Sequence, residues 1–339
     1  MEKLLSFILP AYNVQEYIGD CLASLVQQDI DKDEYEIIVV DDGSTDSTKE
    51  RVEAFINRHN GYTIKLISKE NGGVSSARNV GFEQAYGKYI WFVDPDDFLL
   101  TNSLGRLRPY LEEGQNIIYL DAKTVAEGTK IDGSEVEHTE ILLSEKEIGG
   151  YQHCGPWTRI VSRQFLIDND IRFCERLAYG EDFLWNHLIL QNRAKADKEY
   201  YVDGYIYYYR LRQNSAYRKA KEVRQTNNSH YMNLVGLAEE YQKLALIPEY
   251  NNGKLRLVTR QAKAAAIFSL VFLPKDYFKK ELKRLKLEGM YPYGFIFRDL
   301  LPSVSIKHTI VGWLMFLLPI ESYAKLLNLV LSQKESKEN

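Results

Sequence analysis

Short apolar runs alternate with amphipathic stretches through the first 115 residues. Runs such as LLSFIL at 4–9 and EIIVV at 36–40 are apolar at successive positions, which is typical of strands buried on both faces. The segment VQEYIGDCLASLVQQ at 14–28 instead places its apolar residues at helical spacing. The order of strand and helix repeats as far as YIWFV at 89–93. This alternation predicts an α/β fold with a mostly parallel sheet and helices on both faces.

Polar residues and glycine mark the ends of two expected helices. Ser44, Thr45 and Asp46 precede an amphipathic stretch, and each of these side chains can cap a helix N-terminus. A later helical pattern runs up to Gly87, where a glycine commonly stops a helix. We therefore predict helices over 47–58 and 74–87.

The pattern changes beyond residue 115. Apolar residues at 117–122 and the tyrosine-rich stretch at 200–211 predict strands, and Glu181 opens a helical stretch between them. From residue 225 onward the spacing is helical to the last residues of the chain. We expect these domains: 1–220, with halves at 1–115 and 116–220, and a helical region at 221–339.

Four polar clusters follow the four strands expected in the first half of the chain. They are Pro10–Asn13, Asp41–Ser44, Asn71–Gly73 and Asp94–Asp97. In open α/β sheets the ligand lies beyond the carboxyl ends of the strands. We therefore expect the four clusters to line one edge of the sheet.

The last of these clusters requires a positive partner. Asp94, Asp96 and Asp97 lie within four positions at the end of an apolar run, where their carboxylates repel one another. Hard oxygen ligands suit Mg²⁺ or Mn²⁺, and such ions take only one or two protein carboxylates and fill the other positions with phosphate and water. The cluster predicts a metal–diphosphate site. An Asp-x-Asp sequence by itself is also common in turns and helix caps.

Composition and charge narrow the class of protein. The chain has 339 residues, is 45% hydrophobic and 27% charged, and carries a net charge of −4, so nucleic acid is not an expected partner. Three separated cysteines predict neither a zinc site nor a disulfide framework and fit a reducing cytosol. The N-terminus lacks the pattern of a signal peptide. The apolar run at 309–320 is too short to span a bilayer, although it could lie on one.

Several motifs together resemble those of family 2 glycosyltransferases with the GT-A fold. They are FILPAYN, EIIVVDDGSTDST, ENGGVSSARNVGFEQAYGKYIWFVDPDDFL and GED at 180–182. Their order and spacing match over the first 220 residues. The resemblance implies transfer of a hexose or N-acetylhexosamine from a UDP-sugar, with inversion at the anomeric carbon. It also implies that 1–115 is the nucleotide-sugar half of the domain and 116–220 the acceptor half.

The resemblance assigns donor-binding roles to matching positions. It makes Asp42, with Asp41 as the less favoured neighbour, the acceptor of the uracil imide N–H. It places Arg78 near a phosphate oxygen. The remaining donor-binding residues are the first-loop residues Pro10, Ala11, Tyr12 and Asn13, the close-approach residues Asn71, Gly72 and Gly73, and Arg210, Arg212 and Ser215 in a segment that closes on the diphosphate.

Metal and catalytic roles follow in the same way. Asp96 is the expected direct ligand of Mn²⁺ or Mg²⁺, and Asp94 meets the ribose or a metal-bound water. Asp182, with Glu181 beside it, is the expected general base at a helix N-terminus that favours the ionised form. Many relatives supply a histidine to the metal, but this chain has none between His187 and His230.

Acceptor and location are less constrained by the sequence. Trp157 fits either a sugar platform or the core. The expected acceptor is a glycan, or a lipid-linked glycan, of the surface or cell wall. Residues 301–339 are compatible with peripheral association with the inner face of the membrane or with packing on the catalytic domain, and the C-terminal helices could form a homo-oligomer. Alternative functions are a non-catalytic nucleotide-sugar-binding scaffold and a nucleotidyltransferase.

Overall fold

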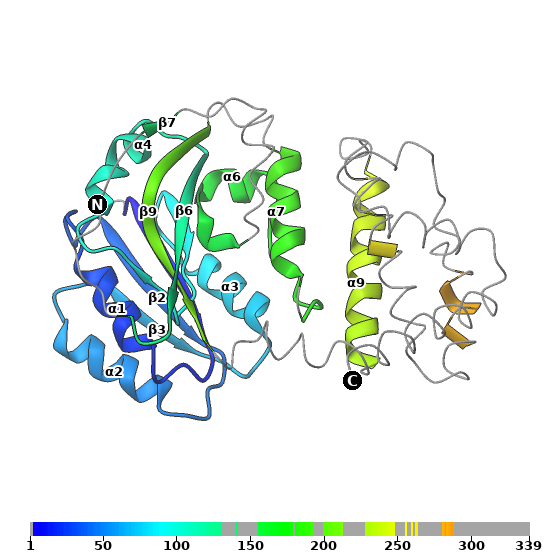
Figure 1. Ribbon diagram of the computed structural model, residues 1–339, viewed down its shortest axis with the longest axis horizontal. Helices are drawn as coiled ribbons and strands as arrows, with labels where there is room; N and C mark the ends of the chain where they lie inside the picture. Colours follow the sequence, from blue (N-terminus) through cyan, green and yellow to red (C-terminus); the bar gives the residue numbers. More distant parts are fainter. Residues whose placement is uncertain are drawn as a thin grey trace, which may run out of the picture. The chain divides into compact units, whose positions relative to one another are not determined.

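The computed structural model describes residues 3–129, 140–141, 155–178, 180–192, 199–212 and 228–247, together with single positions between 255 and 287. The chain divides into two compact units, Met1–Ser215 and Ala216–Asn339. Figure 1 shows the elements of both. The strands are β1 (Leu5–Ala11), β2 (Tyr35–Asp41), β3 (Ile64–Ser68), β4 (Tyr89–Phe92), β5 (Phe98–Leu99), β6 (Ile117–Ala126), β7 (Glu140–Ile141), β8 (Arg159–Ser162) and β9 (Glu199–Leu211).

Helices in the first unit fall between these strands. The α-helices are α1 (Ile18–Val26), α2 (Thr48–Arg58), α3 (Val74–Glu83), α4 (Arg108–Glu112), α6 (Arg163–Asp168) and α7 (Glu181–Asn192). Four of them, α1, α2, α3 and α7, lie in segments that the sequence pattern predicts to be helical. Two short 3₁₀ helices, η1 (Leu104–Arg106) and η2 (Pro156–Thr158), complete the described set. The predicted helix at 47–58 is confirmed within one residue, and Asp46 accepts a hydrogen bond from the backbone N–H of Thr48 at 3.0 Å.

The described strands form one mixed sheet in the order β3-β2-β1-β4-β8-β6-β9-β5, with β7 also paired to β9. Strands β3, β2, β1 and β4 are parallel neighbours, as predicted for the first half of the chain. The second half is not purely parallel, because β8 runs antiparallel to both β4 and β6. The parallel half places the carboxyl ends of β1, β2, β3 and β4 at one edge.

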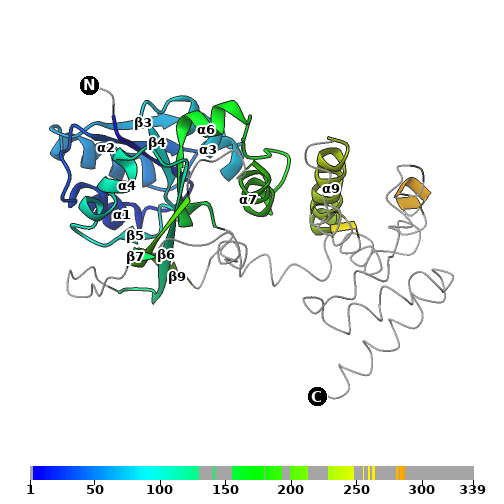
Figure 2. The ribbon, with the colours of Figure 1, turned by 90° about the horizontal axis from the view of Figure 1, so that it is seen from above.

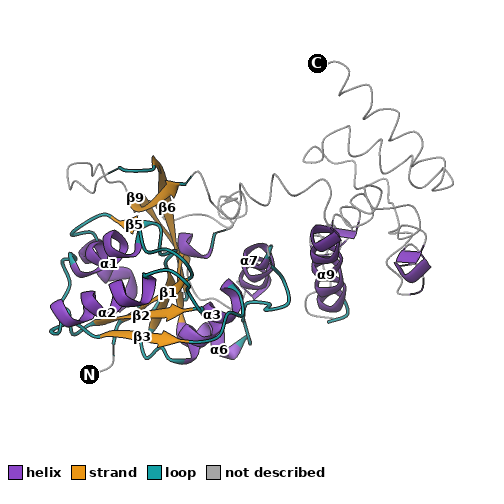
Figure 3. Cartoon of the chain, turned by 90° about the horizontal axis from the view of Figure 1, so that it is seen from below, coloured by secondary structure: helices purple, strands orange, loops and turns teal. Residues whose placement is uncertain are grey.

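Helices cover both faces of this sheet (Figure 2). Side chains alternate along β1: Phe7 and Leu9 pack in a cluster with residues of α1 and α2, whereas Ile8 packs in a second cluster with residues of α3, α6 and α7. Figure 3 also shows the strands lying between helices on the two sides of the sheet. Strands that are buried on both faces must be apolar at successive positions, which explains the continuous apolar runs in the sequence.

The prediction that Gly87 stops a helix is wrong. Helix α3 ends at Glu83, and Gly87 instead lies against β1, where an added Cβ would come within 2.5 Å of the Ser6 backbone nitrogen. Its N–H donates to Ser6 Oγ at 2.8 Å. Gly87 is therefore required by the close approach of two backbone segments and not by helix termination.

The second unit contains helix α9 (Asn228–Ala245), which agrees with the helical spacing predicted from residue 225 onward. Val235, Ala238 and Tyr241 form its buried face. Among the described residues of this unit, Arg284 lies 2.8 Å from Glu281 and 3.8 Å from Glu239. Lys243 also lies 3.1 Å from Glu240, so these two basic side chains contact acidic partners of the same unit. Residues 301–339 lie outside the described residues, and none of the described helices is long and apolar enough to cross a membrane.

Candidate functional site

The first polar cluster begins within β1 and not after it. Pro10 and Ala11, predicted in a loop, are the last residues of the strand and are buried. The carbonyl of Ala11 accepts a hydrogen bond from Asp42 N–H at 2.8 Å. Tyr12 is 49% exposed at the sheet edge, where its ring is accessible to a ligand. Asn13, at a positive φ of 51°, accepts from Thr45 N–H at 2.8 Å and so joins the first loop to the second.

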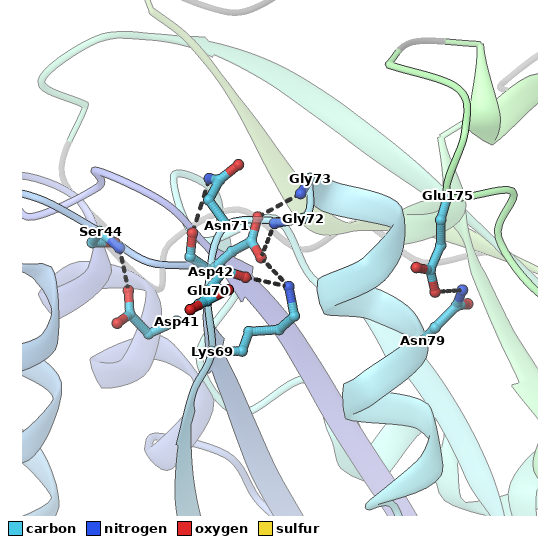
Figure 4. Close-up of polar contacts among 10 residues, drawn as sticks. All are labelled: Asp41, Asp42, Ser44, Lys69, Glu70, Asn71, Gly72, Gly73, Asn79 and Glu175. Carbon is cyan, nitrogen blue, oxygen red and sulfur yellow. Dashed lines mark hydrogen bonds and ion pairs between the residues drawn. The ribbon is translucent and has the colours of Figure 1, made fainter.

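The buried carboxylate of Asp42 accepts three hydrogen bonds at this edge of the sheet (Figure 4). Its Oδ1 accepts from Lys69 Nζ at 2.6 Å and from Gly72 N–H at 3.0 Å, and its Oδ2 accepts from Gly73 N–H at 2.8 Å. Asn71 Nδ2 donates to the Asp42 carbonyl at 2.9 Å. The turn after β3 is thus folded around the carboxylate that ends β2.

Asp41 performs a local task. Its Oδ1 accepts from Ser44 N–H at 3.1 Å and closes the turn that contains Gly43. Gly43 has φ of +74°, and an added Cβ would lie 2.9 Å from the Asn71 backbone nitrogen. A side chain at this position would be strained and would press on the second turn, so the glycine allows the two turns to approach.

Arg78 joins Asp94 and Glu181, which lie 87 residues apart in the sequence. Its Nη1 lies 3.0 Å from Glu181 Oε1, and its Nη2 lies 3.1 Å from Asp94 Oδ1. The guanidinium is almost fully buried and lies 4.9 Å from the centre of the Phe173 ring. Arg78 therefore contacts carboxylates in this structure, a role different from the phosphate contact expected from the resemblance.

Asp182 lies in the first turn of α7, as predicted. Its Oδ1 accepts from Phe183 N–H at 2.8 Å. Burial, followed by the negative charge of Glu181, raises the pKa of Asp182 to about 6, although the Phe183 N–H and the charge of Arg78 act in the opposite direction. A carboxyl group with a pKa near neutral is suited to exchange a proton under working conditions.

Asp97 has a structural role in the acidic turn. Its Oδ2 accepts from the Tyr207 hydroxyl at 2.7 Å, and its Oδ1 accepts from Arg210 N–H at 2.8 Å. Burial and the neighbouring charges of Asp96 and Asp94 raise its pKa well above the usual range. Asp97 thus attaches the turn after β4 to strand β9.

Asp96 faces a cation supplied by the chain itself. Its Oδ2 lies 2.5 Å from Arg212 Nε in an ion pair, although the geometry does not meet that of a hydrogen bond. Burial, followed by the charge of Asp94, raises the pKa of Asp96 to about 6 despite Arg212. The negative charge of this turn is therefore only partly compensated.

The fit of a metal to this turn rests on Asp94 and Asp96. In the described ranges, no three His, Cys, Asp or Glu side chains are grouped to hold a metal ion. Mg²⁺ and Mn²⁺ need fewer protein ligands than that when a diphosphate supplies the others. The repulsion between Asp94 and Asp96 would decrease in the presence of a divalent cation, so the two carboxylates fit such an ion.

The end of β9 packs against helix α1. The Arg210 and Arg212 guanidinium groups lie 5.5 and 5.1 Å from the centre of the Tyr17 ring, and Tyr17 in turn donates to Glu127. Arg210 also lies 3.4 Å from Asp20 Oδ2. Both arginines also contact the acidic turn, Arg210 through its N–H to Asp97 and Arg212 through its ion pair with Asp96. Ser215, the third predicted residue of this segment, lies outside the described residues.

Trp157 is half-buried and stacks on two tyrosines of β9. Its ring centre lies 4.8 Å from that of Tyr207 and 5.5 Å from that of Tyr209, at interplanar angles of 13° and 20°. An added Cβ on Gly155 would lie 2.4 Å from the indole, so this glycine leaves the space that the ring occupies. The contacts favour the core alternative over a free sugar platform, because aromatic side chains already cover part of the indole.

Sequence reasoning did not identify Lys69, Tyr17 and Tyr207 as residues of the site. Lys69 stands directly after the apolar residues of β3, and a basic residue at the end of a parallel strand could have been included on that ground. Tyr207 lies among many tyrosines of one strand, and no local signal separates it from its neighbours. Tyr17 looks like an ordinary apolar position of a helix.

The α/β sheet, the acidic turn after β4 and the carboxylates that open α7 together define a glycosyltransferase domain of the GT-A fold. Residues 6–164 match the family model for Glycosyl transferase family 2. Residues 6–164 thus carry a domain of this family.

Two similar proteins are named for poly(ribitol-phosphate) and for teichoic acid. The chain is 30% identical over 255 residues to the poly(ribitol-phosphate) β-N-acetylglucosaminyltransferase TarS of Staphylococcus aureus, a match that covers 73% of this chain and 43% of TarS. It is 31% identical over 262 residues to the minor teichoic acid biosynthesis protein GgaB of Bacillus subtilis, which covers 72% of this chain and 28% of GgaB. The chain thus spans less than half the length of these relatives.

A solved structure supports the same fold. Residues 1–349 of Staphylococcus aureus TarS in complex with UDP-GlcNAc superpose with a TM-score of 0.57 at 27% identity, over 80% of this chain and 82% of that one. The predicted α/β fold of GT-A type is confirmed by this likeness.

Proposed function

We propose that the protein transfers a hexose or N-acetylhexosamine from a UDP-sugar to a hydroxyl group of a cell-wall or surface glycan, with inversion at the anomeric carbon. The observation that carries the proposal is the Arg78 guanidinium, which lies 3.0 Å from Glu181 and 3.1 Å from Asp94. Through it, the carboxylates that open α7 and the acidic turn after β4 belong to one constellation. An in-line displacement needs a base on one side of the sugar and charge compensation on the other.

The donor occupies the edge formed by the ends of β1, β2 and β3. Tyr12 covers the base, and Asp42 accepts the imide N–H of uracil through the lone pair of Oδ2 that remains beside the Gly73 contact. Asp41 and Asn13 keep their loops in place. Asn71, Gly72 and Gly73 let the backbone approach the nucleotide closely. The TarS complex with UDP-GlcNAc supports this class of donor.

Asp94 and Asp96 would hold Mn²⁺ or Mg²⁺, and the bound ion would neutralise the charge that develops on the leaving UDP. Arg212 would compete with such an ion for the Asp96 carboxylate, since its Nε lies 2.5 Å from Asp96 Oδ2. We assign Arg210 and Arg212 to the diphosphate. Ser215 belongs to the same proposed segment.

Asp182 accepts the proton of the attacking hydroxyl. Its raised pKa of about 6 leaves it ionised at neutral pH while keeping it basic enough to share a proton in the transition state. Glu181 holds the start of α7 through Arg78, so it positions Asp182. Removal of the Asp182 carboxylate should therefore lower the transfer rate more than it lowers UDP affinity.

The acceptor is proposed to be an anionic wall or surface polymer, because TarS and GgaB are named for poly(ribitol-phosphate) and teichoic acid. We place the reaction at the cytoplasmic face of the membrane and assign the membrane contact to residues 301–339. Deletion of 301–339 should move the protein from the membrane fraction to the soluble fraction, and unchanged sedimentation would contradict that assignment. Light scattering on the same samples determines whether the C-terminal region forms a homo-oligomer.

The first experiment measures UDP release from UDP-GlcNAc, UDP-glucose and other UDP-sugars with Mn²⁺, Mg²⁺ or EDTA. Wild type is compared with Asp96→Ala and with the surface control Asp168→Ala on α6. Metal-dependent release from one sugar that is lost only in Asp96→Ala supports the transferase. Tight UDP binding without release, in wild type and variants alike, would instead indicate a non-catalytic binding protein.

A further inference from the structure

Lys69 occupies a position at the donor edge that the proposed reaction does not use. Its Nζ lies 2.6 Å from Asp42 Oδ1 and donates to the Glu70 carbonyl at 2.7 Å. Its backbone N–H donates to the Asp41 carbonyl at 3.0 Å, which fixes the residue next to the end of β2. The Lys69 side chain is 21% exposed, against 3% for Asp42, so its ammonium group is the more accessible of the two charges.

The surrounding backbone leaves room for this ammonium group. An added Cβ on Gly72 would lie 2.8 Å from Lys69 Nζ and 3.0 Å from Ser76 Oγ. Gly72 and Gly73 donate their own N–H groups to the same carboxylate, as Figure 4 shows. The lysine, the carboxylate and the glycine turn therefore form one packed arrangement.

This arrangement has one donor and one acceptor left over. An ammonium group carries three N–H donors, and the described contacts of Lys69 use two of them. A carboxylate has about four lone-pair sites, and the described contacts of Asp42 use three. A ligand at this edge thus meets an acceptor and a charged donor side by side.

We propose that Lys69 is a specificity-determining residue that reads the pyrimidine base, by donating a hydrogen bond to a carbonyl next to the imide N–H that Asp42 accepts. The inference rests on the proposed function, since it assumes a uridine nucleotide at this edge. Uracil offers a donor N–H flanked by two carbonyl acceptors, which complements the pair. Cytosine offers an unprotonated ring nitrogen and an amino group, so it would place a lone pair against Asp42 and a donor against Lys69.

Nucleotide binding tests the proposal without any knowledge of the acceptor. Isothermal titration in the presence of Mn²⁺ would measure UDP, CDP, 2-thio-UDP and 4-thio-UDP binding to the full-length wild type, Lys69→Met and Lys69→Arg. Lys65→Met is the matched control, because Lys65 is on β3, the strand that directly precedes Lys69, and contacts Gln84 at 2.5 Å, away from Asp42. Thermal unfolding of each variant shows whether it is folded.

The expected result is a loss of about tenfold in UDP affinity for Lys69→Met, with CDP affinity unchanged or higher. The preference for UDP over one of the two thio analogues should disappear in Lys69→Met and persist in Lys65→Met. Lys69→Arg should recover part of the preference, since it keeps a charged donor. If Lys69→Met retains the wild-type ratios for CDP and for both thio analogues, the assignment to Lys69 is wrong. If the wild type itself binds no UDP, the proposed function fails first.

Discussion

Acidic turns follow β2 and β4 of the same sheet, and the negative charges of the two turns are compensated in different ways. At the end of β2, Asp42 receives three donors from Lys69, Gly72 and Gly73, all within 31 residues of it in the sequence. After β4, the cations near Asp96 come from β9, more than a hundred residues away, and the pKa of Asp96 is still raised to about 6.

This difference indicates two kinds of preparation for a ligand. The first turn is complete without a ligand, because backbone donors fix its carboxylate in one orientation. The second turn keeps uncompensated negative charge, which a protein tolerates where a cation is to bind. We infer a binding edge that is built in advance and a reaction edge that is completed by its metal and substrate.

The largest expected effect separates reaction from binding. Asp182→Asn keeps the shape of the side chain but cannot accept a proton, so the transfer rate should fall by about 10²- to 10⁴-fold. UDP affinity should change less than about threefold, because the proposed mechanism places Asp182 on the acceptor side of the sugar and away from UDP. Transfer assays combined with UDP titration measure both quantities. Equal losses in rate and affinity would show that the two edges are not separable in this way.

The second effect tests whether the binding edge is built in advance. Asp42→Ala leaves Gly72 N–H, Gly73 N–H and Lys69 without their acceptor, so it should lower the free energy of unfolding by about 1–3 kcal/mol and also weaken UDP binding. Urea denaturation of the ligand-free protein measures the stability change. Asp168→Ala, at an exposed position, is the control. A stability loss of the same size in this control would contradict the conclusion that Asp42 holds the binding edge together.

The third effect concerns the pH dependence of the reaction edge. With a pKa of about 6, Asp182 is protonated at lower pH and cannot act as a base. The single-turnover rate at saturating Mn²⁺ and donor should therefore fall about tenfold per pH unit below about pH 6 and level off above it. Asp182→Asn should lack this step in its residual rate. A wild-type profile that is flat from pH 5 to 8 would contradict the assignment of the base.

The smallest effect is a gain in stability. The folded-state pKa of Asp96 lies above its unfolded value, so ionisation of Asp96 destabilises the fold as pH rises from about 4 to 6, and the full penalty is present above pH 6. In the absence of metal, Asp96→Asn should raise the free energy of unfolding by about 1 kcal/mol at pH 8. The gain should shrink as pH falls from about 6 to about 4, because Asp96 is then protonated in the folded state. Thermal unfolding at several pH values checks this, and a loss of stability at pH 8 would mean that the Arg212 ion pair outweighs the repulsion.

Much of the first half of the molecule follows from local sequence. Strands β1, β2 and β4 are mostly apolar because they are buried on both faces, and polar residues follow β2 and β4 closely, so the strand-end positions of Asp42 and Asp94 could be predicted. The start of α7 at Glu181 was likewise predicted from the local spacing of apolar residues. Gly87 failed because its cause is a contact with β1 and not the end of its own helix.

The sequence by itself determined the parallel half of the sheet, the polar edge and the residue types that gather there. Only the tertiary structure decided which charges meet. Arg78 lies between Asp94 and Glu181, and Arg212 lies on Asp96, because α3, α7 and β9 converge on the turn after β4. Such pairings depend on packing between segments that are distant in the chain, whereas periodicity and turn chemistry report only on neighbours in sequence.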